Sequence, residues 1–195
     1  MEEFDLLKKR LMNERPNAWA DFPDIEIYKD QLLSYMQRQN ISTGADDALT
    51  GAMISNYVKM GLMPGPVDKK YEREHIAYLT AIQVLKQVMS VSDTKLLLES
   101  QPDIKDTEAF YGDFRLLLDG ALNTAATLLD STDEAALPRG ILRIALSAYA
   151  GKIIYDSLLS VLREREESRQ KKEGSGKPEE PLPQIEPSLE EEGIT

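Results

Sequence analysis

The segment 61–66, with the sequence Gly-Leu-Met-Pro-Gly-Pro, constrains the fold of this 195-residue chain more than any other. Glycine adopts positive φ readily and ends helices, and prolines this close together exclude a helix across them. The chain must therefore stop one helix near Gly61, turn, and start again. Thr50 is a good N-cap residue and predicts where the helix that ends at Gly61 begins.

Helical periodicity on both sides of this break predicts a mainly α fold. Residues 67–71 are short and charged, and we expect them to be extended. We expect the stretch 139–165 to be buried, because it is apolar on most sides. Apolar residues at helical spacing predict a short helix within 1–20, helices over 24–39, 50–60, 73–89, 105–130 and 139–165, and one capped by Ser90 or Ser92.

The domain organisation follows from changes in composition. We expect a short N-terminal helix over 1–19, a main domain over 20–100 and a helical region over 101–165 that serves dimerisation or effector sensing. Residues 171–195 contain four prolines, three glycines and many glutamates, so we expect 166–195 to be a disordered acidic tail.

The absence of cysteine excludes disulfides, thiolate catalysis and cysteine-ligated metals. The first ten residues lack the apolar core of a signal peptide. The most apolar stretch, 141–162, contains Arg143, Lys152 and Asp156, whereas a membrane span needs about 20 residues with few charges. We therefore expect a cytoplasmic protein that does not associate with membranes.

We find no pattern typical of an enzyme. The chain has no glycine-rich phosphate-binding motif and no nucleophile elbow. His75 is the only histidine, and no Glu/His or Asp/His spacing points to a metal site. We expect His75 to be a surface or half-buried residue on a helix. We expect the protein to be non-enzymatic, without catalytic, cofactor-binding or metal-binding residues.

The charge distribution directs attention to the middle of the chain. The formal net charge is −11, yet residues 51–100 hold six Lys/Arg against five Asp/Glu, whereas 1–50 and 101–195 both have an acidic excess. On the helix 50–60, Ser55, Asn56 and Lys59 share one outer stripe. Small polar residues suit base edges and a cation suits phosphate, so this stripe fits a helix that enters the major groove.

Three further cations, Lys69, Lys70 and Arg73, follow the turn and are placed to hold the sugar-phosphate backbone. The alternative interpretations are an ordinary exposed helix face for the first set and a solvated turn for the second. Asp68, Glu72 and Glu74 alternate with the cations of the turn and weaken their positive field.

These residues resemble the MerR family pattern T-L-R-Y-Y-E-x-x-G-L-L-P-P, followed by a wing Y-R-x-Y and then by S-L-E-E-I-x-x-L. The corresponding segments are M-I-S-N-Y-V-K-M-G-L-M-P-G-P over 53–66, D-K-K-Y-E-R-E-H-I over 68–76 and S-V-S-D-T-K-L-L over 90–97. Lys69 aligns with the arginine of the family's wing, which contacts the DNA backbone in such proteins. The family's structural positions are matched by Ile54, Tyr57, Gly61, Leu62, Pro64 and Tyr71.

The chain departs from this pattern at three positions. Ser55 stands where the family usually has arginine, Asn56 replaces the first tyrosine of the pair, and Asp68 replaces the wing tyrosine. The resemblance implies a winged helix-turn-helix with a small β-hairpin wing, and a homodimer formed by the helices that follow. The departures put its DNA contacts in question.

A closer resemblance covers residues 19–100. W-A-D-F-P-D-I-E-I-Y over 19–28, together with I-S-N-Y-V-K-M-G-L and K-K-Y-E-R-E-H-I-A-Y-L, looks like the bacterial family called domain of unknown function 1836. That resemblance implies a low-GC Gram-positive source and the MerR-like fold, but no established activity.

The sequence thus predicts a mainly α protein, with a MerR-like winged helix-turn-helix before a C-terminal helical region. Its expected function is DNA-binding transcriptional regulation, with double-stranded DNA, a second copy of itself and an unidentified effector as partners. The alternative is a protein–protein interaction module on a helix-turn-helix scaffold that has lost DNA binding. The expected DNA-contacting residues are Ser55, Asn56, Lys59, Lys69, Lys70 and Arg73.

Overall fold

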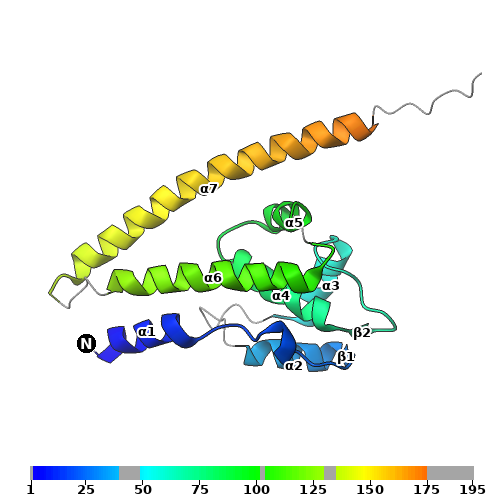
Figure 1. The fold of residues 1–195 in the computed structure, drawn as a ribbon, viewed down its shortest axis with the longest axis horizontal. Helices are drawn as coiled ribbons and strands as arrows, with labels where there is room; N and C mark the ends of the chain where they lie inside the picture. The colour runs from blue at the N-terminus through cyan, green and yellow to red at the C-terminus, as the bar shows by residue number, and fades with distance from the viewer. Residues whose placement is uncertain (1, 40–48, 102–103, 130–134, 175–195) are drawn as a thin grey trace, which may run out of the picture. The chain divides into compact units, whose positions relative to one another are not determined.

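The structure, a computed structural model, describes residues 2–39, 49–101, 104–129 and 135–174, and these parts are mainly helical, as the sequence predicts (Figure 1). The chain divides into two compact units, Met1–Ile154 and Tyr155–Thr195, and the last helix continues from the first unit into the second. In order, the elements are α1 (Glu2–Asn13), the 3-10 helix η1 (Trp19–Asp21), β1 (Ile27–Tyr28), α2 (Lys29–Arg38), α3 (Gly51–Lys59), β2 (Lys70–Tyr71), α4 (Arg73–Leu85), α5 (Val91–Glu99), α6 (Thr107–Leu129) and α7 (Leu137–Gly174).

Helix α4 is the centre of the first unit. Residues on several sides of this helix are at most 1% exposed, and α2, β2 and α6 all pack against it. The core extends into α6, because Phe110 and Tyr111 belong to the same buried cluster. The break in composition near residue 101 therefore does not mark the end of the core. The fully covered residues of α4 are Ile76, Ala77, Leu79, Thr80, Ala81 and Ile82.

The ends of α3 and α5 lie where the sequence signals predict. Thr50 Oγ1 accepts the N–H of Met53 at 3.2 Å and so caps α3. At the other end Gly61 has φ +68°, and the N–H of Leu62 donates to the Tyr57 carbonyl at 2.9 Å. This is a Schellman motif, which satisfies the last carbonyls of a helix. Of the two serines considered for α5, Ser90 is the cap.

The predicted helix over 24–39 is wrong in its first turn. Ile27 and Tyr28 form β1, and α2 begins only at Lys29. Ile25 is 68% exposed, although its spacing suggested an inward position. The backbone of β1 finds its hydrogen-bond partners in β2, far along the chain, so no local pattern marks this strand.

The segment 67–71, which the sequence analysis predicts as a wing and which is called the wing below, differs from a simple hairpin. Val67 and Lys70 exchange two backbone hydrogen bonds, of 3.1 and 2.8 Å, around a two-residue turn. Beyond this single bridge, β2 pairs antiparallel with β1, Ile27 opposite Tyr71. The predicted extended segment is therefore present, but the strand that precedes α2 holds it in place.

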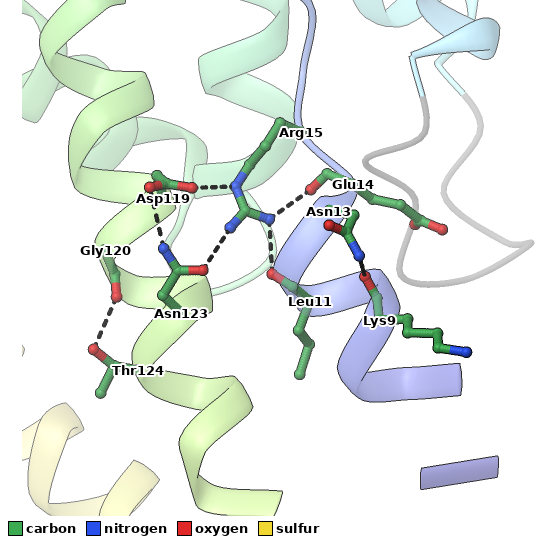
Figure 2. A network of polar contacts seen from close by, with 9 residues as sticks. All are labelled: Lys9, Leu11, Asn13, Glu14, Arg15, Asp119, Gly120, Asn123 and Thr124. Atoms are coloured by element: carbon green, nitrogen blue, oxygen red, sulfur yellow. Dashed lines mark hydrogen bonds and ion pairs between the residues drawn. The ribbon is translucent and has the colours of Figure 1, made fainter. Parts of the chain in front are cut away.

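A half-buried arginine, Arg15, joins the N-terminal segment to α6 (Figure 2). The Arg15 guanidinium donates to Asp119 Oδ1 and to Asn123 Oδ1 on α6, and also to the carbonyl of Leu11 at 2.7 Å in α1. The side chain is 16% exposed, so the ion pair with Asp119 is partly shielded from water. Arg15 thus caps the end of α1 and fixes it against α6.

Helix α7 departs from two expectations. It continues to Gly174, beyond the predicted end at 165 and into the predicted tail. The residues Arg163–Lys172 are mostly Glu, Arg and Lys, which favour helix even when nothing covers them. The stretch expected to be buried is mostly exposed, with Tyr149 at 65% and Ile154 at 61%. By length and composition alone, Leu137–Lys171 would also suffice to cross a membrane.

We expect Tyr111→Phe to lower the free energy of unfolding by about 1 kcal/mol near pH 7, because the Tyr111 hydroxyl donates to the Asn17 carbonyl at 2.8 Å. Burial raises the pKa of Tyr111 above its ordinary value of 10.0. The unfolded chain therefore ionises first, and the wild type loses stability as the pH rises above 10. The variant lacks this part of the loss, so the difference should shrink in urea titrations at about pH 7 and about pH 10.5. A difference that grows with pH would contradict this account.

Candidate nucleic-acid interface

Helix α3 presents its two predicted faces as expected. Ile54 and Tyr57 are buried, at 0% and 4% exposure, and hold the helix on the core. Ser55, Asn56 and Lys59 are exposed on the outer stripe. A single helix therefore separates a packing face from a polar face that is open to a partner.

Ser55 is engaged by a residue that the sequence analysis did not single out. Lys29 Nζ, at the start of α2, donates to Ser55 Oγ at 2.9 Å, and Ser55 Oγ donates to the Gly51 carbonyl at 3.0 Å. Lys29 thus adds a cation to the outer face of α3. Only the packing of α2 on α3 brings the two residues together, so their spacing of 26 residues gave no signal.

Asn56 and Lys59 are less constrained. The Asn56 amide contacts Met60 Sδ at 3.4 Å, and a thioether is a weak acceptor that a better partner can replace. Lys59 makes no hydrogen bond or ion pair within the described residues. Behind it, Lys95 Nζ donates to the Met60 carbonyl at 2.9 Å and so caps the end of α3. At this end of the polar face, Lys59 is therefore available to a partner, whereas Lys95 is occupied by the Met60 carbonyl.

Lys69 lies at the tip of the wing in an unusual backbone conformation. Asp68 and Lys69 have φ values of +48° and +66°. Two-residue hairpin turns of this kind favour Asn-Gly or Gly-Gly, since a residue with a Cβ is strained there by about 1–2 kcal/mol. The Lys69 side chain is exposed and unpaired within the described residues. The turn therefore presents a free cation at the cost of backbone strain.

The other two wing cations are tied to the protein. Lys70 Nζ forms an ion pair with Glu26 at 2.7 Å, and the hydrogen bond and charge of Glu26 raise the pKa of Lys70 above its ordinary value. Arg73 Nε donates to the Pro23 carbonyl at 3.2 Å. Both residues thus attach the wing to the segment around β1, and their charges are less available than the sequence suggested.

A hollow of about 430 Å³ connects the start of α2 with the wing. Lys29 stands on its α2 side and Lys69 on its wing side, while Asp30 adds one negative charge. Lys29 also donates to Ser55 on the outer face of α3, so this one residue connects the hollow with that face. The remaining lining residues are Tyr28, Pro66 and Tyr71.

His75 is buried, at 4% exposure, contrary to the expectation of a surface or half-buried residue. Its Nδ1 accepts the N–H of Glu72 at 2.9 Å, so the proton is on Nε2, which lies 3.2 Å from the Gly65 carbonyl. The imidazole therefore caps α4 and at the same time holds the turn that leads into the wing. Its partner Gly65 lies in an irregular turn, where sequence spacing gives no warning of the contact.

In the described parts of the chain, no three His, Asp or Glu side chains are grouped so that they could hold a metal ion. The fold thus defines a helical domain with a two-stranded sheet, in which the start of α2 and the wing tip line one hollow.

The family model for Domain of unknown function (DUF1836) matches residues 17–114, half of the chain, and the chain belongs to this family. The match runs from Asn17, whose carbonyl accepts the Tyr111 hydroxyl, to Phe114, which packs on the same core. Comparison with curated proteins gives no match. Comparison with solved structures gives none either.

We expect His75→Phe to lower the free energy of unfolding by about 2–3 kcal/mol, because it leaves a helix-capping N–H and a loop carbonyl without partners. Glu74→Ala, an exposed change in the same turn, should stay within about 0.5 kcal/mol of the wild type. Equal effects of the two changes in thermal unfolding would show that the two bonds of His75 do not hold this turn.

We expect Lys69→Gly to raise the free energy of unfolding by up to about 1 kcal/mol, since glycine removes the strain at φ +66°. Lys69→Val should lower it by about the same amount or more, because a β-branched side chain fits this conformation worst. Urea unfolding measures both changes. A glycine variant less stable than the wild type would contradict the strained turn.

Proposed function

We propose that this protein is a DNA-binding transcriptional regulator with a MerR-like winged helix-turn-helix, in which α3 enters the major groove and the wing follows the backbone. The element order of two helices, a wing and two further helices is the order that the MerR resemblance implies. Ser55 and Asn56 face the base edges in this proposal, and Lys59 and Lys69 contact phosphates.

The observation that carries the proposal is the strained, unpaired Lys69 at the tip of the wing. Strained backbone at an exposed tip is retained where the side chain it presents has a use. Lys29 and Lys69 line the same hollow, and Lys29 also donates to Ser55 on α3, so a phosphate beside an inserted α3 would meet both cations. Lys29 is therefore added to the proposed contacts, and Lys70 and Arg73 become supports of the wing rather than its main phosphate ligands.

We expect purified full-length protein to enrich specific duplexes from a random pool and to bind them with a steep salt dependence. Lys59→Ala and Lys69→Ala should each flatten the slope of log K against log salt by roughly 0.9, one phosphate contact per residue. Asn56→Ala should relax sequence preference while leaving the slope unchanged. The matched control is Lys9→Ala, which removes the same charge from α1, an element that packs on α6.

A protein-interaction module is the second candidate, and the pairing of Lys70 with Glu26 favours it. Together with Asp30 at the hollow, Glu26 reduces the positive field that DNA would need. If no duplex is enriched even at about 50 mM salt, where phosphate binding is strong, the DNA proposal is rejected in favour of this one.

A further inference from the structure

We propose that a second hollow, between the N-terminal segment and α6, binds a small organic acid with one carboxylate group and an apolar body. We call it the α6 hollow. This inference does not depend on the proposed DNA binding. The α6 hollow has a volume of about 270 Å³. Its lining residues are Arg15, Pro16, Gly112, Arg115, Leu116 and Asp119. Only Gly112 falls within the residues that the family model matches, 17–114, so the family match does not account for the α6 hollow.

Two separate segments of the chain form the walls of the α6 hollow. The four lining residues of α6 follow one another at spacings of three, one and three, which places them on the same side of the helix. The other wall is Arg15 and Pro16, which follow α1. The Arg15 guanidinium donates to Asp119 and Asn123 of α6 and so holds the two walls together (Figure 2).

The two arginines of the α6 hollow differ in their hydrogen bonds. Every nitrogen of the Arg15 guanidinium donates to a side-chain or main-chain oxygen. Arg115 is half-buried and makes no hydrogen bond or ion pair within the described residues, and its Nε atom is buried. A guanidinium is always charged and has five N–H donors, so leaving a half-buried one without acceptors is unfavourable. Arg115 is therefore the group that the oxygens of a ligand would satisfy.

The charges of the α6 hollow favour one negative charge on the ligand. Asp119 is paired with Arg15, so the charge of Arg115 is the one that is not compensated. A carboxylate carries a single charge and accepts two parallel hydrogen bonds from a guanidinium. A phosphate monoester carries a charge of about −1.5 to −2 at pH 7, and the additional charge would be repelled by Asp119.

The remaining lining residues determine the size and polarity of the ligand body. Pro16 and Leu116 are apolar, and Gly112 leaves the wall open, because a Cβ atom there would meet nothing within 4 Å. A water molecule takes up about 30 Å³ in the liquid, so the α6 hollow suits a ligand of roughly eight to ten non-hydrogen atoms. Acids with a short aliphatic chain or a single benzene ring have this size.

NMR titration of the full-length protein with benzoate and with hexanoate tests the proposal. We expect saturable binding in about the millimolar range, with amide shifts concentrated at Gly112, Arg115 and Leu116. Benzamide, the neutral analogue of benzoate, should not bind, and phenyl phosphate should bind no more tightly than benzoate. No saturable shift at these residues with either acid, or equal binding of benzamide, would overturn the site. Tighter binding of phenyl phosphate would overturn the carboxylate ligand.

Removal of the free guanidinium tests the role of Arg115. Arg115→Gln should weaken benzoate binding by about tenfold or more, because charge-assisted hydrogen bonds are lost. Arg38→Gln is the matched control, since it makes the same replacement on α2, at a residue that does not line the α6 hollow. This control should bind benzoate as the wild type does. Equal affinities of the two variants would contradict a carboxylate held by Arg115.

Filling the α6 hollow tests the site even if Arg115→Gln fails to fold. Gly112→Leu places a side chain where a Cβ atom has room, and leucine favours helix more than glycine does, so this variant should fold. It should abolish benzoate binding. Gly120→Leu makes the same replacement on α6 outside the α6 hollow, where a Cβ atom also meets nothing within 4 Å, and should leave binding intact. Binding retained in both variants, or lost in both, would overturn the proposed site.

Discussion

The need to cover α4 from every side determines the architecture of the first unit. Residues on opposite sides of this helix, such as Ala77, Leu79 and Thr80, are completely buried, and a small chain without disulfides has only its own elements to cover them. α2, β2 and α6 each take one part of the surface. The polar face of α3 and the wing are attached to this arrangement through α2 and β2, so their positions follow from the burial of α4.

Aromatic packing explains why the family match extends to residue 114. The rings of Phe22 and Tyr111 are tilted by 47° with centroids 5.0 Å apart, and the Trp19 ring centroid lies 6.4 Å from that of Tyr111. The segment before β1 and the start of α6 are therefore one structural unit, though about 90 residues separate them in sequence. A domain that ended near 100 would expose Phe22 and leave the Asn17 carbonyl without the Tyr111 hydroxyl.

The sequence predicted the features whose causes are local. The cap at Thr50, the stop at Gly61 and the inward face of α3 each depend on residues within a few positions of one another, and the structure contains them all. The candidate site could be located for the same reason, since α3 and the wing turn are contiguous segments. Contacts between segments that are distant in the chain could not be predicted from the sequence. β1 is recognisable only through β2, Lys29 is relevant only because α2 packs on α3, and the role of His75 depends on the carbonyl of Gly65.

The same distinction applies to charge, and it bears on what the interface can bind. In the sequence, the three cations near the wing look equivalent. The structure shows that they differ in whether they are bound to other parts of the protein. Lys70 and Arg73 hold the wing to the segment before α2, and only Lys69 is free within the described residues. Because Coulomb attraction at an exposed site depends on unpaired charge, the positive field at this end of the domain comes mainly from Lys29, Lys59 and Lys69. Three dispersed cations attract phosphate only modestly, so under the proposed function the specificity for DNA would come from the polar side chains of α3.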